Sequence, residues 1–204
     1  MSAVAESLNT MKFKLGINAS RARSGGAIAH LVGILGQVNP ADYGVSEVHV
    51  WSYARLLEAL PSAPWLVRHS PADLDRSLLH QLWWEKFTLP RELRRTGSSI
   101  LLNVDAGSVC RFQPSVTMSR DMLSYEPGEE NRYGISKARL RLIALRYVQN
   151  ASLRSSSGVI FLTRYAGEVI QKSCGPLDDI AYIPHGVGER FLIDGNPGGW
   201  PLDG

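Results

Sequence analysis

The feature that most constrains the fold of this chain is a regular alternation of short apolar segments with longer helical ones. The patterns predict strands at residues 13–18, 45–50, 65–68, 99–104, 116–119, 158–163 and 180–183. Between them, helical patterns run through 28–35, 53–60, 73–87, 135–154 and 165–172. Because helical crossovers of this length connect parallel strands, we expect an α/β domain with a doubly wound, mostly parallel sheet and helices on both faces.

Composition excludes several classes of protein. Of the 204 residues, 44% are hydrophobic and 20% charged, so the chain can bury a core. Lys and Arg (22) barely outnumber Asp and Glu (19), and no nucleic-acid partner is expected from a net charge of +3. No stretch approaches the roughly 18 consecutive apolar residues of a membrane-spanning helix. Residues 1–10 lack the basic and apolar regions of a secretory signal, which favours a cytoplasmic protein.

The same patterns divide the chain into three segments. We expect a flexible leader at 1–11, one domain at 12–193, and a Gly- and Pro-rich linker or truncation tail at 194–204. The two cysteines, Cys110 and Cys174, are expected to be reduced, partly buried thiols. Neither has a second Cys or His at the spacing of zinc ligands, so no metal site is expected.

Sites in doubly wound sheets lie at the carboxyl ends of the strands, which here lead into loops at 21–26, 105–107, 120–126, 163–164 and 185–186. In the first loop, Gly25 and Gly26 precede a helix whose backbone N–H groups could approach a phosphate, although a tight turn also requires glycine. In the third, Arg120 and Asp121 could bind phosphate or sugar hydroxyls. The competing interpretation of these two is a solvated ion pair.

Two further features are ambiguous. Arg132, Arg139 and Arg146 recur every seven residues, which predicts a row along one side of the long helical segment. A solvated face is the favoured interpretation, and the alternative is a contact with an anionic acceptor or peripheral binding at the inner face of a membrane. His185 follows the last predicted strand and is a candidate site residue, although a turn explains most of the Pro184-His185-Gly186 motif.

Taken as a set, several motifs resemble those of glycosyltransferase family 4, the group 1 glycosyl transferases. Residues 158–165 and 180–191 are similar to its strand ending in Ser or Thr, its helix, and its strand closing on Ile-Pro-Asn-Gly-Val, with His185 in place of Asn. Upstream, Ser24-Gly25-Gly26 resembles the Gly-Gly loop of the family. Residues 117–121 resemble its Thr-x-x-His-Asp segment, with Arg120 in place of His. The resemblance covers about residues 12–193.

The resemblance implies that the chain is a Rossmann-like domain, the N-terminal, acceptor-side half of a GT-B fold. Such an enzyme is a retaining hexosyltransferase that moves a sugar from a nucleotide-sugar co-substrate to a glycan or lipid-linked acceptor. The implied residues are Asp121 and Arg120 for catalysis, Gly25 and Gly26 for the donor phosphates, and Asp105, Glu126 and Arg164 for the acceptor. Neither a metal nor another cofactor is implied.

The family carries two Glu separated by seven residues in its donor half, and no such pair occurs here. A C-terminal Rossmann-like domain is therefore expected as the missing partner, and the chain alone as catalytically incomplete. A free-standing module that binds a carbohydrate or nucleotide without chemistry is the alternative function. A small oxidoreductase is disfavoured by the absence of a G-x-G-x-x-G motif.

Overall fold

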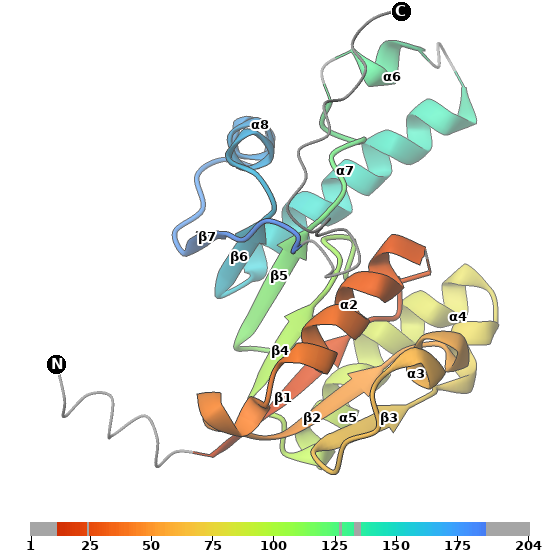
Figure 1. Ribbon diagram of the computed structural model, residues 1–204. Helices are drawn as coiled ribbons and strands as arrows, with labels where there is room; N and C mark the ends of the chain where they lie inside the picture. Colours follow the sequence, from red (N-terminus) through yellow and green to blue (C-terminus); the bar gives the residue numbers. More distant parts are fainter. Residues whose placement is uncertain (1–11, 24, 127, 133–135, 187–204) are drawn as a thin grey trace, which may run out of the picture.

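A computed structural model describes residues 12–23, 25–126, 128–132 and 136–186. The expected leader and tail, and the end of the expected domain at 187–193, lie outside the described residues. The described residues form a seven-stranded, all-parallel sheet in the order β3-β2-β1-β4-β5-β6-β7 (Figure 1). Its strands are β1 (Phe13–Asn18), β2 (Val45–Trp51), β3 (Leu66–His69), β4 (Ile100–Asn103), β5 (Ser115–Ser119), β6 (Gly158–Phe161) and β7 (Ile180–Tyr182).

The helices lie between the strands, as predicted. They are α2 (Gly25–Gln37), α3 (Ala54–Ala59), α4 (Leu78–Trp83), α5 (Leu89–Thr96), α6 (Glu129–Arg132), α7 (Lys137–Ser155) and α8 (Arg164–Cys174). Short 3-10 turns, η1 (Pro40–Tyr43) and η2 (Ala72–Asp75), and a π-helical turn, η3 (Trp84–Thr88), complete the connections. No helix in the described part of the chain is long and apolar enough to cross a membrane.

The strand register shows which helices share a face of the sheet. Asn18 pairs with Trp51 and Asn103, Asn103 with Thr117, and Thr117 with Val159, so these side chains form one row on one face. The π turn and α5 pack at one end of this row, and α7 and α8 pack at the other. Helices α2 and α3 pack against β1 and β2 on the opposite face. The expected doubly wound sheet with helices on both faces is therefore confirmed.

The prediction of one helix at 73–87 was wrong in detail. The structure has η2, α4 and η3 there, and α5 follows directly. Pro90 explains the irregular turn, because it has no N–H to donate. Before it the helix widens, and the Leu89 N–H donates to the Trp84 carbonyl, five residues back. Helix α5 then continues to Gly97, whose φ of 75° caps it.

Residues 104–114, which link β4 to β5, contain no helix, and no helical pattern was predicted there. The predicted row of arginines is interrupted, because Arg132 belongs to α6, while Arg139 and Arg146 lie on α7. The cysteines behave as expected, since Cys110 and Cys174 are both buried and unpaired.

Close packing also explains a glycine in the first strand. A Cβ atom on Gly16 would lie 2.3 Å from Cδ2 of Leu93, which is buried on α5. Glycine at this position therefore lets α5 approach the centre of the sheet.

A chain of polar side chains links β2 to the edge strand β3. Oε2 of Glu47 lies 3.1 Å from Nε2 of His49, whose Nδ1 lies 3.0 Å from Nε2 of His69. The His69 ring stacks on Trp51 with 4.5 Å between ring centroids. The pKa of His69 is lowered to about 4, first by burial and then by the charges of His49 and Arg95. His69 is therefore neutral at neutral pH.

Candidate functional site

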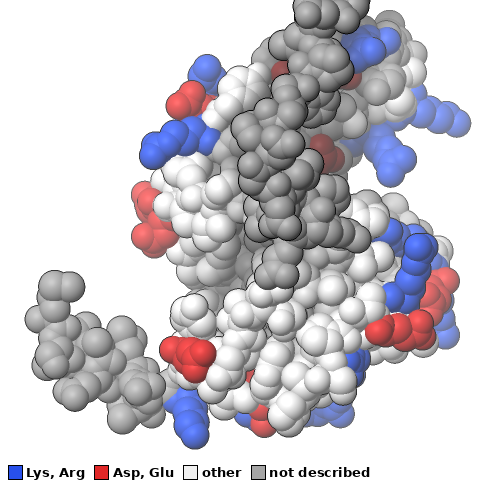
Figure 2. Space-filling model, viewed as in Figure 1, with Lys and Arg blue, Asp and Glu red and all other residues white. Residues whose placement is uncertain are grey.

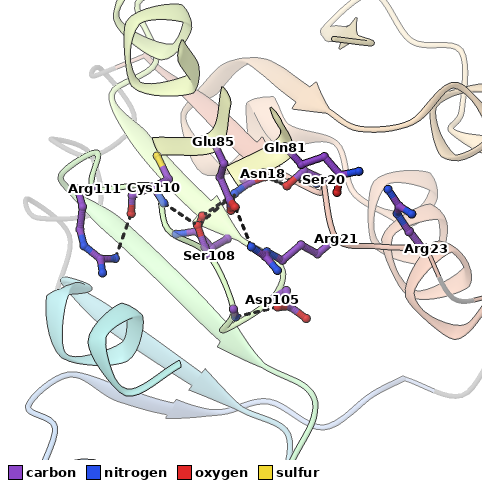
Figure 3. Close-up of polar contacts among 12 residues, drawn as sticks. Asn18, Ser20, Arg21, Arg23, Gln81, Glu85, Asp105, Ser108, Cys110 and Arg111 are labelled. Carbon is purple, nitrogen blue, oxygen red and sulfur yellow. Dashed lines mark hydrogen bonds and ion pairs between the residues drawn. The ribbon is translucent and has the colours of Figure 1, made fainter. Parts of the chain in front are cut away.

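Strands β1 and β4 are neighbours in the centre of the sheet, and from them the chain proceeds in opposite directions, to β2 and β3 on one side and to β5 on the other. This is the topological switch point of a doubly wound sheet, where ligands bind outside the carboxyl ends of the strands. The loop after β1, which leads into α2, and the loop after β4 meet at this point. Polar side chains of both loops lie together there in Figure 3.

A buried hydrogen-bond network joins the ends of the two strands. Nδ2 of Asn18, at the end of β1, lies 2.8 Å from Oε1 of Glu85, 3.1 Å from Oδ1 of Asn103 and 3.2 Å from Oγ of Ser108. Its Oδ1 accepts hydrogen bonds from the hydroxyl of Ser20 at 2.7 Å and from the Ser20 N–H at 3.2 Å. All five side chains are buried. Such a satisfied network holds the two loops in a fixed arrangement.

Arg21 is the charged residue that this network positions. Its NH2 group lies 3.1 Å from Oε2 of Glu85, and the Glu85 side chain is only 3% exposed, against 28% for Arg21. Nε of Arg21 is buried and has no hydrogen-bond partner among the described residues. Asp105 lies beside Arg21 in Figure 3, and its Oδ1 accepts a hydrogen bond from the Gly107 N–H at 2.7 Å. The Arg21 side chain is partly exposed, so its guanidinium could contact an anion or a sugar oxygen through groups other than the buried Nε.

The π turn is what brings Glu85 into this network. Trp84 and Glu85 are consecutive and both buried, whereas Trp83 and Phe87 are exposed on the other side of the turn. Sequence reasoning did not select Glu85. The indication in the sequence was that Glu85 directly follows two tryptophans in an apolar pattern, which suggests that its carboxylate is buried. A buried carboxylate needs a cationic partner.

Arg120, after β5, lies close enough to Asp105, after β4, for the two charges to interact. Nε of Arg120 donates to the Val104 carbonyl at 2.8 Å, so the side chain lies across the end of β4. Burial lowers the pKa of the Arg120 guanidinium, while the carboxylates of Asp105 and Asp121 raise it. Asp121 is exposed, and its Oδ1 accepts a hydrogen bond from the Leu123 N–H at 2.8 Å, which stabilises the following turn.

His185 lies against α2. Its Nδ1 is 2.9 Å from Nδ1 of His30, and the two rings meet edge to face. Burial lowers the pKa of His30, and the charges of His185 and Arg120 lower it further. Three strand-end segments therefore contribute to one place on the sheet edge: the first turns of α2, the end of β5 and the end of β7.

Four other predicted residues lie around this edge. Glu126 Oε1 accepts a hydrogen bond from the Tyr165 hydroxyl at 3.3 Å, and the Arg164 guanidinium carbon lies 5.3 Å from the centroid of the Tyr182 ring. The first contact links the loop after β5 to the start of α8, and the second links the start of α8 to β7. Helix α2 begins at Gly25, and a Cβ atom on Gly25 or Gly26 would meet no atom of the described residues within 4 Å.

A pocket of about 350 Å³ lies at the carboxyl ends of β1, β2 and β3. Its polar lining consists of Arg23, Tyr53, Arg55, Asp75 and Arg76, above apolar side chains of α2, α3 and η2. The Arg23 guanidinium carbon lies 4.3 Å from the Tyr53 ring centroid. Its NH2 donates to the Tyr53 hydroxyl and to the Leu74 carbonyl.

Sequence reasoning included Arg23 in the first loop but missed the other two arginines. The signal was that Arg55 lies five residues, and Arg76 eight residues, after the end of a predicted strand. What the sequence could not show is that η2 returns to the sheet edge and brings both beside Tyr53.

Within the described ranges, no three His, Cys, Asp or Glu side chains are grouped so that they could hold a metal ion. The candidate site is therefore built from arginines, hydroxyls, amides and single carboxylates. No protein-family model matches the chain, and no curated protein sequence matches it significantly.

Proposed function

We propose that this chain is the acceptor-side domain of a retaining glycosyltransferase that moves a sugar from a nucleotide-sugar to a glycan or lipid-linked acceptor. The observation that carries the proposal is the pocket beside α2, because it combines three arginines with an aromatic ring and a carboxylate. Its volume suits a monosaccharide or a sugar phosphate. Arginines bind phosphate through a planar fork, while Asp75 can accept paired hydroxyl hydrogens. The family 4 motifs of the sequence agree with this assignment.

In this proposal the switch point is where donor and acceptor meet. The backbone N–H groups of Gly25 and Gly26 support the donor diphosphate, and Arg21 and Arg120 offset the negative charge that develops as the diphosphate departs. That diphosphate helps to deprotonate the acceptor hydroxyl, and Asp121 orients the reacting sugar. Asp105, Glu126 and Arg164 line the acceptor side, and His185 closes the edge beside α2.

A second Rossmann-like domain completes the donor site in this proposal. The described edge offers a diphosphate only a few donors, each worth about 0.5–1.5 kcal/mol net in exchange for water. Association costs an estimated 4–15 kcal/mol, so such contacts cannot bind a nucleotide-sugar tightly. The chain alone is therefore expected to bind nucleotide-sugars poorly and to transfer no sugar.

Titration calorimetry of the 204-residue chain tests the proposal. A sugar phosphate such as mannose 1-phosphate should bind in the millimolar range, and Arg55→Gln should weaken that binding about tenfold by removing one charge-assisted contact. Arg141→Gln, which removes an exposed arginine of α7, is the matched control and should have no effect. Low-micromolar binding of UDP- or GDP-sugars, or no effect of Arg55→Gln, would overturn the proposal. Binding without turnover when a donor domain is supplied would identify a binding module instead.

Asp121 gives a separate test in a complete two-domain transferase. Asp121→Asn should lower turnover by about 100-fold, the scale of one lost oriented contact in the transition state. The amide oxygen of Asn can still accept the hydrogen bond from Leu123, so the turn and the melting temperature should be preserved. Near-normal turnover in this variant contradicts the role given to Asp121.

A further inference from the structure

A single glutamine ties together three segments at the rim of the pocket beside α2. Nε2 of Gln81, on α4, lies 3.0 Å from the Leu74 carbonyl oxygen and 2.9 Å from the Arg76 carbonyl oxygen, at the end of η2. Oε1 of Gln81 accepts a hydrogen bond from the hydroxyl of Tyr53 at 3.4 Å. Tyr53 directly precedes α3 and lines the pocket, whereas Gln81 is not among the lining residues. Gln81 can therefore act on a ligand only through its neighbours.

The two carbonyls fix the orientation of the Gln81 amide. A carbonyl oxygen can only accept a hydrogen bond, so the N–H₂ group of the amide must face Leu74 and Arg76. The amide oxygen must then face Tyr53, and that oxygen has no proton to give. The Tyr53 hydroxyl therefore donates its one proton to Gln81.

A second contact completes the constraint on Tyr53. The NH2 group of Arg23 donates to the Tyr53 hydroxyl, and a guanidinium cannot accept. Figure 3 shows Gln81 and Arg23 near each other, as their shared contact with Tyr53 requires. Because the hydroxyl proton is already used, the Tyr53 oxygen can only accept a hydrogen bond from a ligand, although a free tyrosine could also donate one.

The other charged side chains of the pocket offer either donors or acceptors. Arg55 and Arg76 are exposed and offer N–H donors, while the Asp75 carboxylate only accepts. Asp73 pairs with Arg76 at 3.8 Å, so the three arginines of the lining face two carboxylates. Figure 2 shows basic and acidic side chains together on the side that carries α3 and α4, beside the uncharged surface of α2. A ligand that matches this pocket carries both an anionic group and hydroxyl donors.

We propose that the pocket selects a phosphorylated sugar, with the phosphate on the arginines and a sugar hydroxyl donating to Tyr53, and that Gln81 is the positioning residue for this selection. At pH 8 a phosphate monoester is a dianion with no proton to donate, so the Tyr53 oxygen disfavours phosphate and favours a hydroxyl. A phosphate without a sugar satisfies the arginines alone. The inference rests on the proposed function, because it names the class of acceptor for the pocket which that proposal assigns to the acceptor side.

NMR titration of the 204-residue chain at pH 8 measures the selectivity, defined as the Kd of methyl phosphate divided by the Kd of mannose 1-phosphate. Tyr53→Phe keeps the ring that lies 4.3 Å from the Arg23 guanidinium carbon and removes the acceptor oxygen. It should lower the selectivity about fivefold, the scale of one neutral hydrogen bond, and leave the Kd of methyl phosphate unchanged.

Gln81→Leu separates the positioning role from a merely structural one. It releases the Tyr53 proton, which can then be donated to phosphate, so the selectivity should again fall about fivefold. Loss of the two bonds to η2 alone would weaken both ligands alike and leave the selectivity unchanged. The double variant Tyr53→Phe/Gln81→Leu should be no less selective than Tyr53→Phe, because both changes act through one hydroxyl. Gln37→Leu, at an exposed glutamine of α2 outside the pocket lining, is the matched control and should keep the selectivity.

The methyl diester of mannose 1-phosphate distinguishes two sources of the same chemistry. Diester binding at least as tight as that of the monoester would identify a phospholipid headgroup, and weaker binding would identify a free sugar phosphate. Either result supports the proposal when the selectivity depends on Tyr53 and Gln81.

The outcomes separate this inference from the proposed function. Unchanged selectivity in Tyr53→Phe or in Gln81→Leu contradicts the inference, and so does a further loss in the double variant; the proposed function survives these results if Arg55→Gln still weakens binding. Equal Kd values for methyl phosphate and mannose 1-phosphate in the unmodified chain also contradict the inference. If the selectivity behaves as expected but no sugar is transferred when a donor domain is supplied, the proposed function fails and the pocket is that of a binding module.

Discussion

Replacement of Glu85 by Gln tests whether the buried ion pair with Arg21 organises the switch point. The substitution keeps the size of the side chain and an oxygen that can accept the hydrogen bond from Asn18. The substitution removes the negative charge. The atom that faces the Arg21 guanidinium is then either the amide N–H₂ group or the uncharged amide oxygen of Gln. Arg21 is then left with a positive charge whose partner at 3.1 Å has been lost.

The expected loss of stability follows from the burial of the two partners. Removal of one member of a fully buried pair costs about 3–5 kcal/mol. Arg21 is 28% exposed and can recover part of its hydration, and the bond to Asn18 is kept, so we expect about 2 kcal/mol. With a urea m-value of about 2 kcal/mol/M, the midpoint of unfolding should fall by about 1 M.

Urea denaturation followed by circular dichroism measures this change. The matched control is Asp73→Asn, which removes the carboxylate of an exposed pair with Arg76 at 3.8 Å and should change stability by less than about 0.5 kcal/mol. If Glu85→Gln is no more destabilising than Asp73→Asn, the buried pair does not organise the site. An unchanged m-value is required for the comparison, since a changed m-value would indicate a different unfolding transition.

Three further predictions concern the rest of the domain. The pKa of His69 is about 4 in the folded chain and near 6.5 in the unfolded chain, so the unfolded state binds the proton first as the pH falls. Stability should therefore be complete above pH 6.5 and decrease by at most about 1.4 kcal/mol per pH unit toward pH 4, and His69→Gln should flatten this slope in urea titrations; equal slopes contradict it. Burial raises the pKa of Cys110 to about 12, so the folded chain at pH 8 should leave this thiol unmodified by iodoacetamide, and rapid labelling contradicts its burial. Gly16→Ala should destabilise by about 1–3 kcal/mol, because buried Leu93 must move, whereas Gly33→Ala on α2 meets open space and should not destabilise in the same denaturation assay.

The sequence by itself determined most of the sheet. All seven strands were predicted within a few residues of their observed bounds, because apolar periodicity is a local property and each segment reports it independently. The crossover rule then required parallel strands, and the strand-end rule directed attention to Asp105, Arg120 and His185, which lie at that edge. The same local reasoning failed at Pro90, where a π turn lets a helix continue past a residue that normally stops it.

The tertiary structure alone decided which side chains meet. Arg21 and Glu85 are 64 residues apart, and His30 and His185 are 155 apart, so no local pattern could pair them. The pocket depends on the return of η2 to the sheet edge, which places Arg76 beside Arg23 and Arg55. The exposure of Trp83 next to buried Trp84 likewise depends on which side of one helical segment faces the sheet. These arrangements arise from long-range packing of helices on strands, where the free energy of burying one face selects the partners and leaves the other face to solvent.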